Sequence, residues 1–222
     1  MRIEDHRNEQ SASGSDGADA LGNILFGAVN PSGKLPNTFP KSESDLPHPT
    51  VTMPPPESSR FNGPASPEQW AKGLPPFPVA YDEGLKVGYK WYDAEKKPVL
   101  FPFGYGLSYT TFRYAGLTIT PGEKVKVAFT LTNSGAREGA EIAEVYAALP
   151  ASAEEPPKRL VGWSKVNLKA GENKKVEVEI DPKYLSIFDE AKDAWTLVPG
   201  DYTILVGGSS DKLPLKATLS LK

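Results

Sequence analysis

The chain has 222 residues with no cysteine, two histidines, 22 prolines and 20 glycines, so proline and glycine are enriched over an average protein. This length is enough for one or two domains, and 39% hydrophobic residues suffice for at least one packed core. A net charge of −3 gives no basic surface for nucleic acid or anionic lipid, and the lack of cysteine excludes disulfide scaffolds and cysteine-based zinc sites. We therefore expect no nucleic-acid partner, no membrane partner and no cofactor.

The start of the chain carries no targeting signal that the sequence reveals. The first ten residues are mostly charged or polar and lack the apolar centre of a secretory signal. No apolar run approaches the roughly 18 residues of a membrane-spanning helix. We expect no export signal and no transmembrane segment in this chain, and the compartment stays open.

Residues 1–45 begin with a small, polar stretch and continue with one short amphipathic helix. Asp16 is placed to cap this helix and Gly27 to help end it. Its apolar residues fall near one face: Ala18, Leu21, Leu25 and Ala28. A single helix of about ten residues cannot bury an apolar face alone, so it requires a partner.

Residues 46–112 read as a proline-rich linker. Fifteen of the 22 prolines lie between Pro31 and Pro102, which argues against helices and central strands over 31–112. The three prolines at 54–56 predict polyproline II structure. This stretch is also rich in aromatic residues, which a free linker seldom carries. We therefore expect it to lie across other domains.

From about Phe112 onward the hydrophobic pattern has a period of two. Alternating runs occupy 125–131, 176–180, 202–206 and 213–221, with further strand candidates at 142–149, 160–168 and 185–188. About seven short strands separated by turn residues predict a mainly β protein, with an antiparallel sandwich of immunoglobulin or fibronectin type III kind over 113–222. Trp163 falls in the strand candidate at 160–168, and we expect both Trp163 and Trp195 in the core or between the sheets.

Six sequence runs carry a family resemblance. In chain order they are ILFGAVNPSGKLP (24–36), TFP (38–40), YDEGLKVGYKWYD (81–93), FPFGYGLSYT (101–110), KRLVGW (158–163) and PGDY (199–202). Together they resemble the C-terminal portion of bacterial glycoside hydrolase family 3, the β-glucosidase and β-xylosidase group. The resemblance extends from about residue 16 to the end.

The resemblance implies three regions and an accessory role. Residues 1–45 would be a remnant of the family's α/β sandwich domain with a loose tail, 46–112 the linker, and 113–222 the fibronectin-like domain. The family's nucleophile and acid/base lie in parts that precede the NPSGKLP run, so no catalytic residue is expected here. The region would buttress those catalytic domains, in cis or in trans, and its uncovered apolar surface would favour self-association.

Carboxylate pairs offer a first check on catalysis within this chain. Retaining glycoside hydrolysis needs two carboxyl groups about 5–5.5 Å apart across one sugar. Adjacent residues on a strand point to opposite faces and do not form such a site. We expect all three adjacent pairs to be solvated surface: Asp82/Glu83, Glu154/Glu155 and Asp189/Glu190.

A small stand-alone hydrolase, esterase-like or glycosidic, is one alternative. Ser209 and Lys212 match the spacing Ser-x-x-Lys, although they fall between two predicted strands and not at a helix start. A Ser-His-Asp relay would have to use His48, which stands between two prolines, or His6. For both histidines we expect an exposed loop position.

A carbohydrate-binding module is the other alternative. Flat aromatic rings suit the apolar faces of pyranose sugars. The candidate sugar-binding residues are Trp70, Tyr81, Trp91, Tyr92 and Tyr105. The competing role for the same rings is to clamp the linker onto neighbouring domains.

Overall fold

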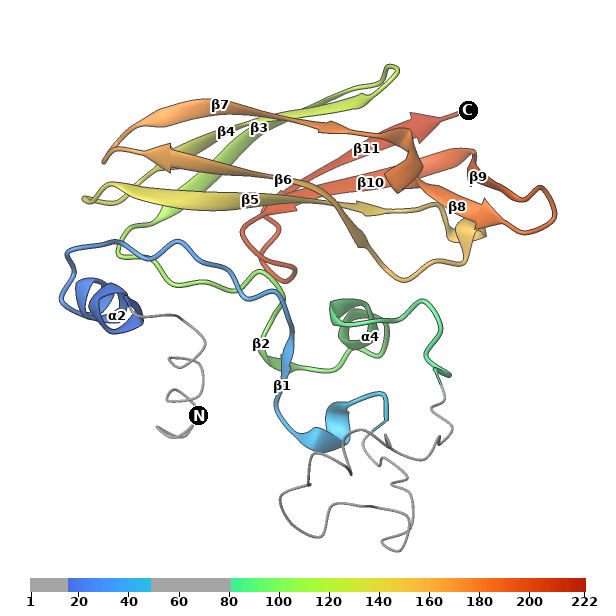
Figure 1. The fold of residues 1–222 in the computed structure, drawn as a ribbon. Coiled ribbons are helices and arrows are strands. Elements are labelled where there is room, and N and C mark those ends of the chain that lie inside the picture. Colours follow the sequence, from blue (N-terminus) through green and yellow to red (C-terminus); the bar gives the residue numbers. More distant parts are fainter. Residues whose placement is uncertain (1–15, 49–80) are drawn as a thin grey trace, which may run out of the picture.

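The computed structural model describes residues 16–48 and 81–222. The predictions on the prolines at 54–56, on Trp70 and on His6 fall outside these residues. The described chain forms a β-sandwich with a smaller N-terminal region lying against one of its faces (Figure 1).

Within the described residues, seven strands form two antiparallel sheets. One sheet has the order β11-β10-β5-β6 and consists of β5 (Gly139–Ala148), β6 (Arg159–Leu168), β10 (Gly200–Gly207) and β11 (Leu215–Leu221). The other has the order β3-β4-β7, with β3 (Phe112–Thr120), β4 (Val125–Asn133) and β7 (Asn173–Ile180). A separate hairpin pairs β8 (Ser186–Asp189) with β9 (Ala194–Leu197). The predicted antiparallel sandwich is confirmed.

The core lies between the two sheets, at the period-two positions of the facing strands. Val127 and Leu131 of β4 and Val145 of β5 have no exposed surface. Burying a side chain of this size stabilises the fold by roughly 1.5–3 kcal/mol. Because a slip of one residue would turn every apolar side chain outward, this alternation also fixes the strand register.

Tyr202 explains the PGDY run at the start of β10. Its ring is fully buried, and its hydroxyl donates to the carbonyl oxygen of Val198 (2.8 Å) and accepts from the Val198 amide (3.2 Å). Gly200, the first residue of β10, has φ of 142° and lies between the two bonded residues in the sequence. The buried hydroxyl therefore has partners and fastens the turn.

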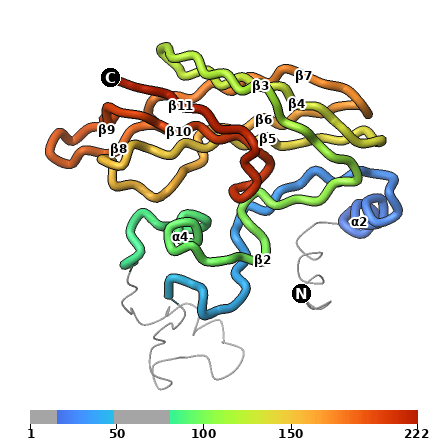
Figure 2. Tube along the Cα trace, turned by 180° about the vertical axis from the view of Figure 1, so that it is seen from behind, coloured from blue at the N-terminus to red at the C-terminus, as the bar shows by residue number. Residues whose placement is uncertain are grey.

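In its described part, the N-terminal region contains two short helices and one pair of short strands. They are α2 (Gly17–Leu25), β1 (Phe39–Pro40), α4 (Tyr89–Ala94) and β2 (Val99–Phe101), and β1 pairs with β2. A short 3₁₀ turn, η1 (Glu43–Asp45), also lies in this region. Two others lie in the connections of the sandwich: η2 (Ala151–Ala153) between β5 and β6, and η3 (Pro182–Leu185) between β7 and β8. In both views the region lies below the sheet that holds β5 and β6 (Figure 2).

The helix predicted after Asp16 is present, and a second helix corrects the prediction for the linker. Asp16 stands at the start of α2 without capping it through its side chain, and Gly27 follows the helix with φ of 77°. The expectation that 31–112 contains no helix is wrong, because α4 forms there. It falls in the one long interval of the linker without proline, between Pro78 and Pro98.

The two tryptophans expected in the core are exposed. Trp163 lies in β6, within a predicted strand, and Trp195 lies in β9, which no predicted range contained; 67% and 52% of their surfaces are accessible. Trp163 pairs in register with Glu144, which alternates with the core residues of β5 and so projects from the outer face. Trp195 belongs to the hairpin outside the two sheets. The strand pattern predicted that Trp163 lies in a strand, but not which face of the sheet its side chain occupies.

Candidate functional site

The NPSGKLP run forms a seam between the N-terminal region and the sandwich, and Asn30 joins three segments there. Its side-chain amide donates to the carbonyl oxygen of Glu138 (2.9 Å). Its carbonyl oxygen accepts from the Ser108 hydroxyl (3.1 Å) and the Tyr109 amide (2.8 Å). An amide with both donor and acceptor capacity fits this position because it bonds to both sides of the seam.

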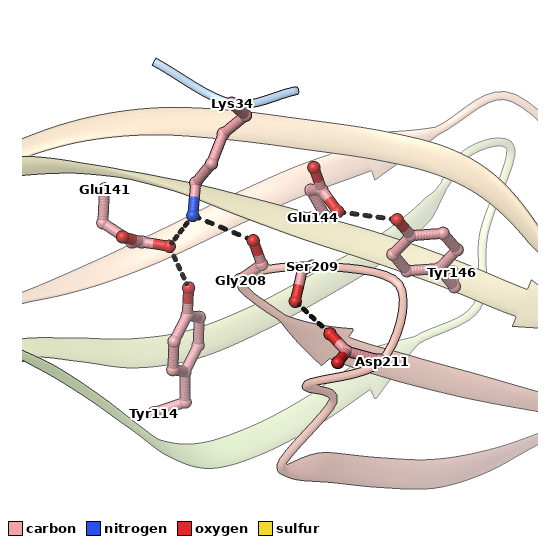
Figure 3. A network of polar contacts seen from close by, with 8 residues as sticks. All are labelled: Lys34, Tyr114, Glu141, Glu144, Tyr146, Gly208, Ser209 and Asp211. Atoms are coloured by element: carbon pink, nitrogen blue, oxygen red, sulfur yellow. Dashed lines mark hydrogen bonds and ion pairs between the residues drawn. The ribbon is translucent and has the colours of Figure 1, made fainter. Parts of the chain in front are cut away.

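Lys34 forms a largely buried ion pair across the same seam. Its Nζ lies 2.9 Å from Oε1 of Glu141 in β5 and donates to the carbonyl oxygen of Gly208 at 2.9 Å (Figure 3). The Tyr114 hydroxyl of β3 donates to the same Oε1 at 3.0 Å. The two charged side chains are only 15% and 10% exposed. Burial, reinforced by the Glu141 charge, raises the pKa of Tyr114, which keeps its hydroxyl a donor.

Backbone bonds and two glycines close the seam. Leu35 donates from its amide to the carbonyl oxygen of Tyr105 (2.8 Å) and accepts from the Gly104 amide (2.9 Å). A Cβ on Gly106 would lie 2.5 Å from the Gly33 carbonyl oxygen. Gly104 has φ of 78°, and a Cβ there would collide with the Glu144 carboxylate. The FPFGYGLSYT run therefore requires glycine at both positions.

Glu144 is a buried carboxyl group on the seam side of β5. It is 4% exposed and accepts a hydrogen bond from the Tyr146 hydroxyl at 2.6 Å (Figure 3). Burial raises the pKa of Glu144 to about 7, although the Tyr146 bond and the charge of Lys34 oppose the change. This carboxyl group therefore titrates near neutral pH, where an ordinary glutamate is fully charged.

The linker helix docks on the sandwich through Tyr89. The Tyr89 hydroxyl accepts from the Leu160 amide at 2.7 Å, and its ring meets Tyr146 edge to face at 5.7 Å. Burial raises the pKa of Tyr89 to about 12. Lys158 forms an ion pair with Asp93 of α4. The KRLVGW run thus supplies two contacts to α4.

Helix α2 is tied to the seam at its end but leaves its apolar face uncovered. The Tyr109 hydroxyl donates to the carbonyl oxygen of Ile24 (2.7 Å), and Arg137 donates to that of Gly27. None of the residues of α2 is buried, and Leu25 and Phe26 are 68% and 92% exposed. The described residues therefore do not supply the partner that this helix requires.

Three of the candidate residues meet at one pocket. Tyr105, Ser209 and Lys212 line a space of about 680 Å³ at the seam, together with Lys34 and Glu141. Ser209 and Lys212 form an isolated bridge in the loop between β10 and β11, as the sequence predicted, and not a helix start. The Ser209 hydroxyl donates to Oδ1 of Asp211 at 2.6 Å (Figure 3).

The other candidate residues lie elsewhere. His48 does not line this pocket; its Nε2 lies 2.7 Å from Oε2 of Glu83, and its side chain is 40% exposed. Tyr81 is 76% exposed and Tyr92 only 7%. The Trp91 indole donates to the carbonyl oxygen of Asp45 at 3.2 Å, and the ammonium groups of Lys86 and Lys97 lie 5.9 and 5.7 Å from the centre of its ring. Of the four described candidate aromatic residues, Tyr105 alone lines the pocket.

The expectation for the carboxylate pairs needs one correction. Glu83 and Glu155 are only 11% and 12% exposed in their side chains, because each is held in an ion pair: Glu83 with His48, and Glu155 with Arg159 at 2.8 Å. Asp189 instead pairs with Lys192 at 2.7 Å on the surface.

Neither a metal-binding group of side chains nor a membrane-spanning helix is found among the described residues. Across residues 16–48 and 81–222, His, Asp and Glu side chains nowhere gather in the threes that would hold a metal ion. Of the helices described, none combines the length and hydropathy needed to cross a membrane.

Comparisons with known proteins agree with this architecture. The model of the glycosyl hydrolase family 3 C-terminal domain matches residues 9–109, and that of a fibronectin type III-like domain matches 141–210. Beta-glucosidase B of Emericella nidulans is 39% identical over 215 residues, which cover 94% of this chain and 24% of the relative. An exo-α-(1→6)-L-arabinopyranosidase of Bifidobacterium breve is 35% identical over 213 residues, covering 94% and 25%.

A solved structure gives the same result. A β-glucosidase from Streptomyces venezuelae in complex with D-glucose superposes with a TM-score of 0.76 at 36% identity, covering 93% of this chain and 25% of that one. The chain spans about a quarter of the length of the relatives it matches. The chain therefore belongs to glycosyl hydrolase family 3 and corresponds to a C-terminal portion of its members, in which the sandwich is a fibronectin type III-like domain.

Proposed function

We propose that this region is a non-catalytic brace, which holds the sandwich against the catalytic domains of a family 3 hydrolase. The observation that carries the proposal is the seam of Asn30, Lys34 and Glu141, which joins the N-terminal region to the sandwich. We assign no catalytic residue to this chain.

The partner of the brace is the remainder of a family 3 enzyme, in cis or in trans. Support comes from α2, whose Leu25 and Phe26 are exposed although the helix is tied to the seam beside them. An apolar face of this kind is covered by other protein in a stable assembly. The 222-residue chain alone then covers it by self-association.

Sedimentation equilibrium of the purified chain tests this proposal. We expect self-association in the wild type and a monomer when Leu25→Ser and Phe26→Ser are combined. The matched control is Tyr184→Ser, which removes a 59% exposed aromatic side chain beside the distant hairpin. A monomeric wild type, or an association that the α2 changes leave unaltered, would contradict the proposed use of this face.

A further inference from the structure

Glu144 projects from β5 at the place where the linker covers the outer face of the sandwich. Its carboxyl group lies so close to Gly104 of the linker that a Cβ there would collide with it. Beside Gly104, the Phe103 ring packs against Tyr89 of α4 at 5.2 Å. Tyr89 in turn meets Tyr146, the hydrogen-bond donor to Glu144, edge to face. The 4% exposure of Glu144 therefore depends on the linker as well as on the sheet.

The ionised form of Glu144 has little compensation in this position. Among the described residues, it takes part in no ion pair. The charge of Lys34 acts on it from the N-terminal region, but the Lys34 ammonium bonds to Glu141 at 2.9 Å. The negative charge of Glu141 disfavours a second carboxylate beside it. One hydrogen bond, from Tyr146, supports the ionised form.

The other groups that surround Glu144 add no net charge. The tyrosine hydroxyls keep their protons, because burial raises the pKa of each, and the register partners on the neighbouring strands are uncharged. These groups are Tyr89, Tyr114 and Tyr146, with Trp163 of β6 and Gly207 of β10. The ion pairs next to the tyrosines each combine one acid with one base: Asp93 with Lys158, and Glu155 with Arg159. Glu144 is thus neutralised mainly by its own proton.

Protonation of Glu144 and docking of the linker therefore favour each other. Burial raises the pKa of the carboxyl group to about 7, whereas a carboxyl group that the linker no longer covers returns toward its ordinary value of 4.5. The docked state thus holds the proton more tightly than the open state. By linkage, docking is strongest below about pH 4.5 and weakens as the pH rises to about 7. Water is close at hand, because Trp163, opposite Glu144 on β6, is 67% exposed.

We propose that Glu144 makes the contact between the linker and the sandwich sensitive to pH. With the proton in place, residues 103–105 stay docked; once Glu144 is ionised, they open locally while the sandwich stays folded. Local opening is possible because the sandwich has its own core, in which Val127 and Leu131 are fully buried. The inference rests on the proposed brace, and it makes the strength of that brace depend on the acidity of the surroundings.

Amide hydrogen exchange of the 222-residue chain between pH 5 and pH 8 tests the proposal, with each rate divided by the intrinsic rate at the same pH. The reporters are three amides that hydrogen-bond across the seam: Leu35, Gly104 and Ser210. Amides of β4 report global unfolding. We expect the protection of the three seam amides to lie below that of β4 and to fall with rising pH, by at most about 70-fold.

Two results of this experiment would overturn the proposal. One is protection of the seam amides that does not change with pH. The other is protection equal to that of β4 at every pH, because the linker would then leave the sandwich only on global unfolding.

Glu144→Gln keeps the size of the side chain and an oxygen that accepts from Tyr146, but it cannot ionise. Its seam amides should keep the same protection from pH 5 to pH 8. The control, Glu123→Gln at an exposed position before β4, should show the wild-type fall. A fall that persists in Glu144→Gln would assign the effect to another group and refute the proposal. The same comparison in the Leu25→Ser/Phe26→Ser variant separates local opening from self-association, since a fall there supports the proposal even if α2 proves not to be a contact surface.

Discussion

The sandwich and the N-terminal region differ in where their stability comes from. Val127, Leu131 and Val145 are completely buried within the sandwich, whereas no residue of α2 is buried. The N-terminal region is joined to the sandwich by polar contacts at the seam and by the Tyr89 ring against Tyr146, whereas Leu21 and Leu25 of α2 remain exposed. The sandwich has a core of its own, and α2 depends on its neighbours. This difference agrees with the proposal that the N-terminal region is part of a larger domain.

The largest effect should come from the core of the sandwich. Leu131→Ala creates a cavity and should lower the free energy of unfolding by about 2–5 kcal/mol. Leu25→Ala in α2, where the side chain is 68% exposed, should change it by less than about 0.5 kcal/mol. Urea unfolding followed by circular dichroism measures both. Similar losses in the two variants would show that α2 is buried in a core after all.

The seam should make stability depend on pH through Glu144. Its folded pKa is raised to about 7, so the folded state holds the proton more tightly than the unfolded state. Stability therefore falls as pH rises from about 4.5 to about 7 and levels off above that. Glu144→Gln removes this dependence and should be more stable at pH 8 by at most about 3 kcal/mol.

The control for this pH effect is Glu123→Gln, at an exposed position in the turn before β4. It should leave the wild-type pH profile in place. Thermal unfolding between pH 4 and 8 compares the three proteins. A Glu144→Gln profile that still falls over this range would mean that another group is responsible.

Removing one partner of the Lys34–Glu141 ion pair should cost more stability than removing both. Lys34→Met leaves the Glu141 carboxylate buried without a cation and should cost about 2 kcal/mol, less than a fully buried pair because both side chains keep some exposure. Adding Glu141→Leu should restore most of the loss. Amide hydrogen exchange at 30–36 reports the seam directly. Unchanged protection there in Lys34→Met would argue against the pair as a fastening.

The smallest expected effect concerns the linker helix. Tyr89→Phe keeps the ring contacts but leaves the Leu160 amide without its 2.7 Å partner, which should cost about 1 kcal/mol. Tyr81→Phe, at a 76% exposed side chain, should cost nothing measurable. Urea unfolding of both variants makes the comparison. Equal stabilities would mean that α4 contributes little to the clamp.

The contrast between the sandwich and the N-terminal region also separates what the sequence could predict from what it could not. The alternation at 125–131 and 202–206 specified strands of the sandwich, because every second residue in these runs is apolar and the pattern is contained within one short segment. The helix after Asp16 was predictable from its amphipathic spacing. In contrast, α4 was hidden by the average proline content of the linker, and the exposure of Trp163 depends on which face of β6 meets the other sheet.

The seam lay beyond sequence reasoning for a physical reason. Lys34 and Glu141 are 107 residues apart, and neither has a local pattern that marks it as half of an ion pair. The NPSGKLP run could be recognised, but its turn-like composition does not reveal that Asn30 bonds to both sides of an interface. The sequence held one weak signal of the seam: Asn30, Lys34 and Glu141 are polar residues with small or apolar residues on both sides.

The most direct test of the central claim is hydrolysis of nitrophenyl β-glucoside and nitrophenyl β-xyloside by the purified 222-residue chain, with its intact mass confirmed. A brace without catalytic residues predicts no turnover, while a complete family 3 β-glucosidase in the same assay cleaves the glucoside. Turnover that scales with the amount of this chain through purification would contradict the account, because a working pair of carboxyl groups would then lie within these residues.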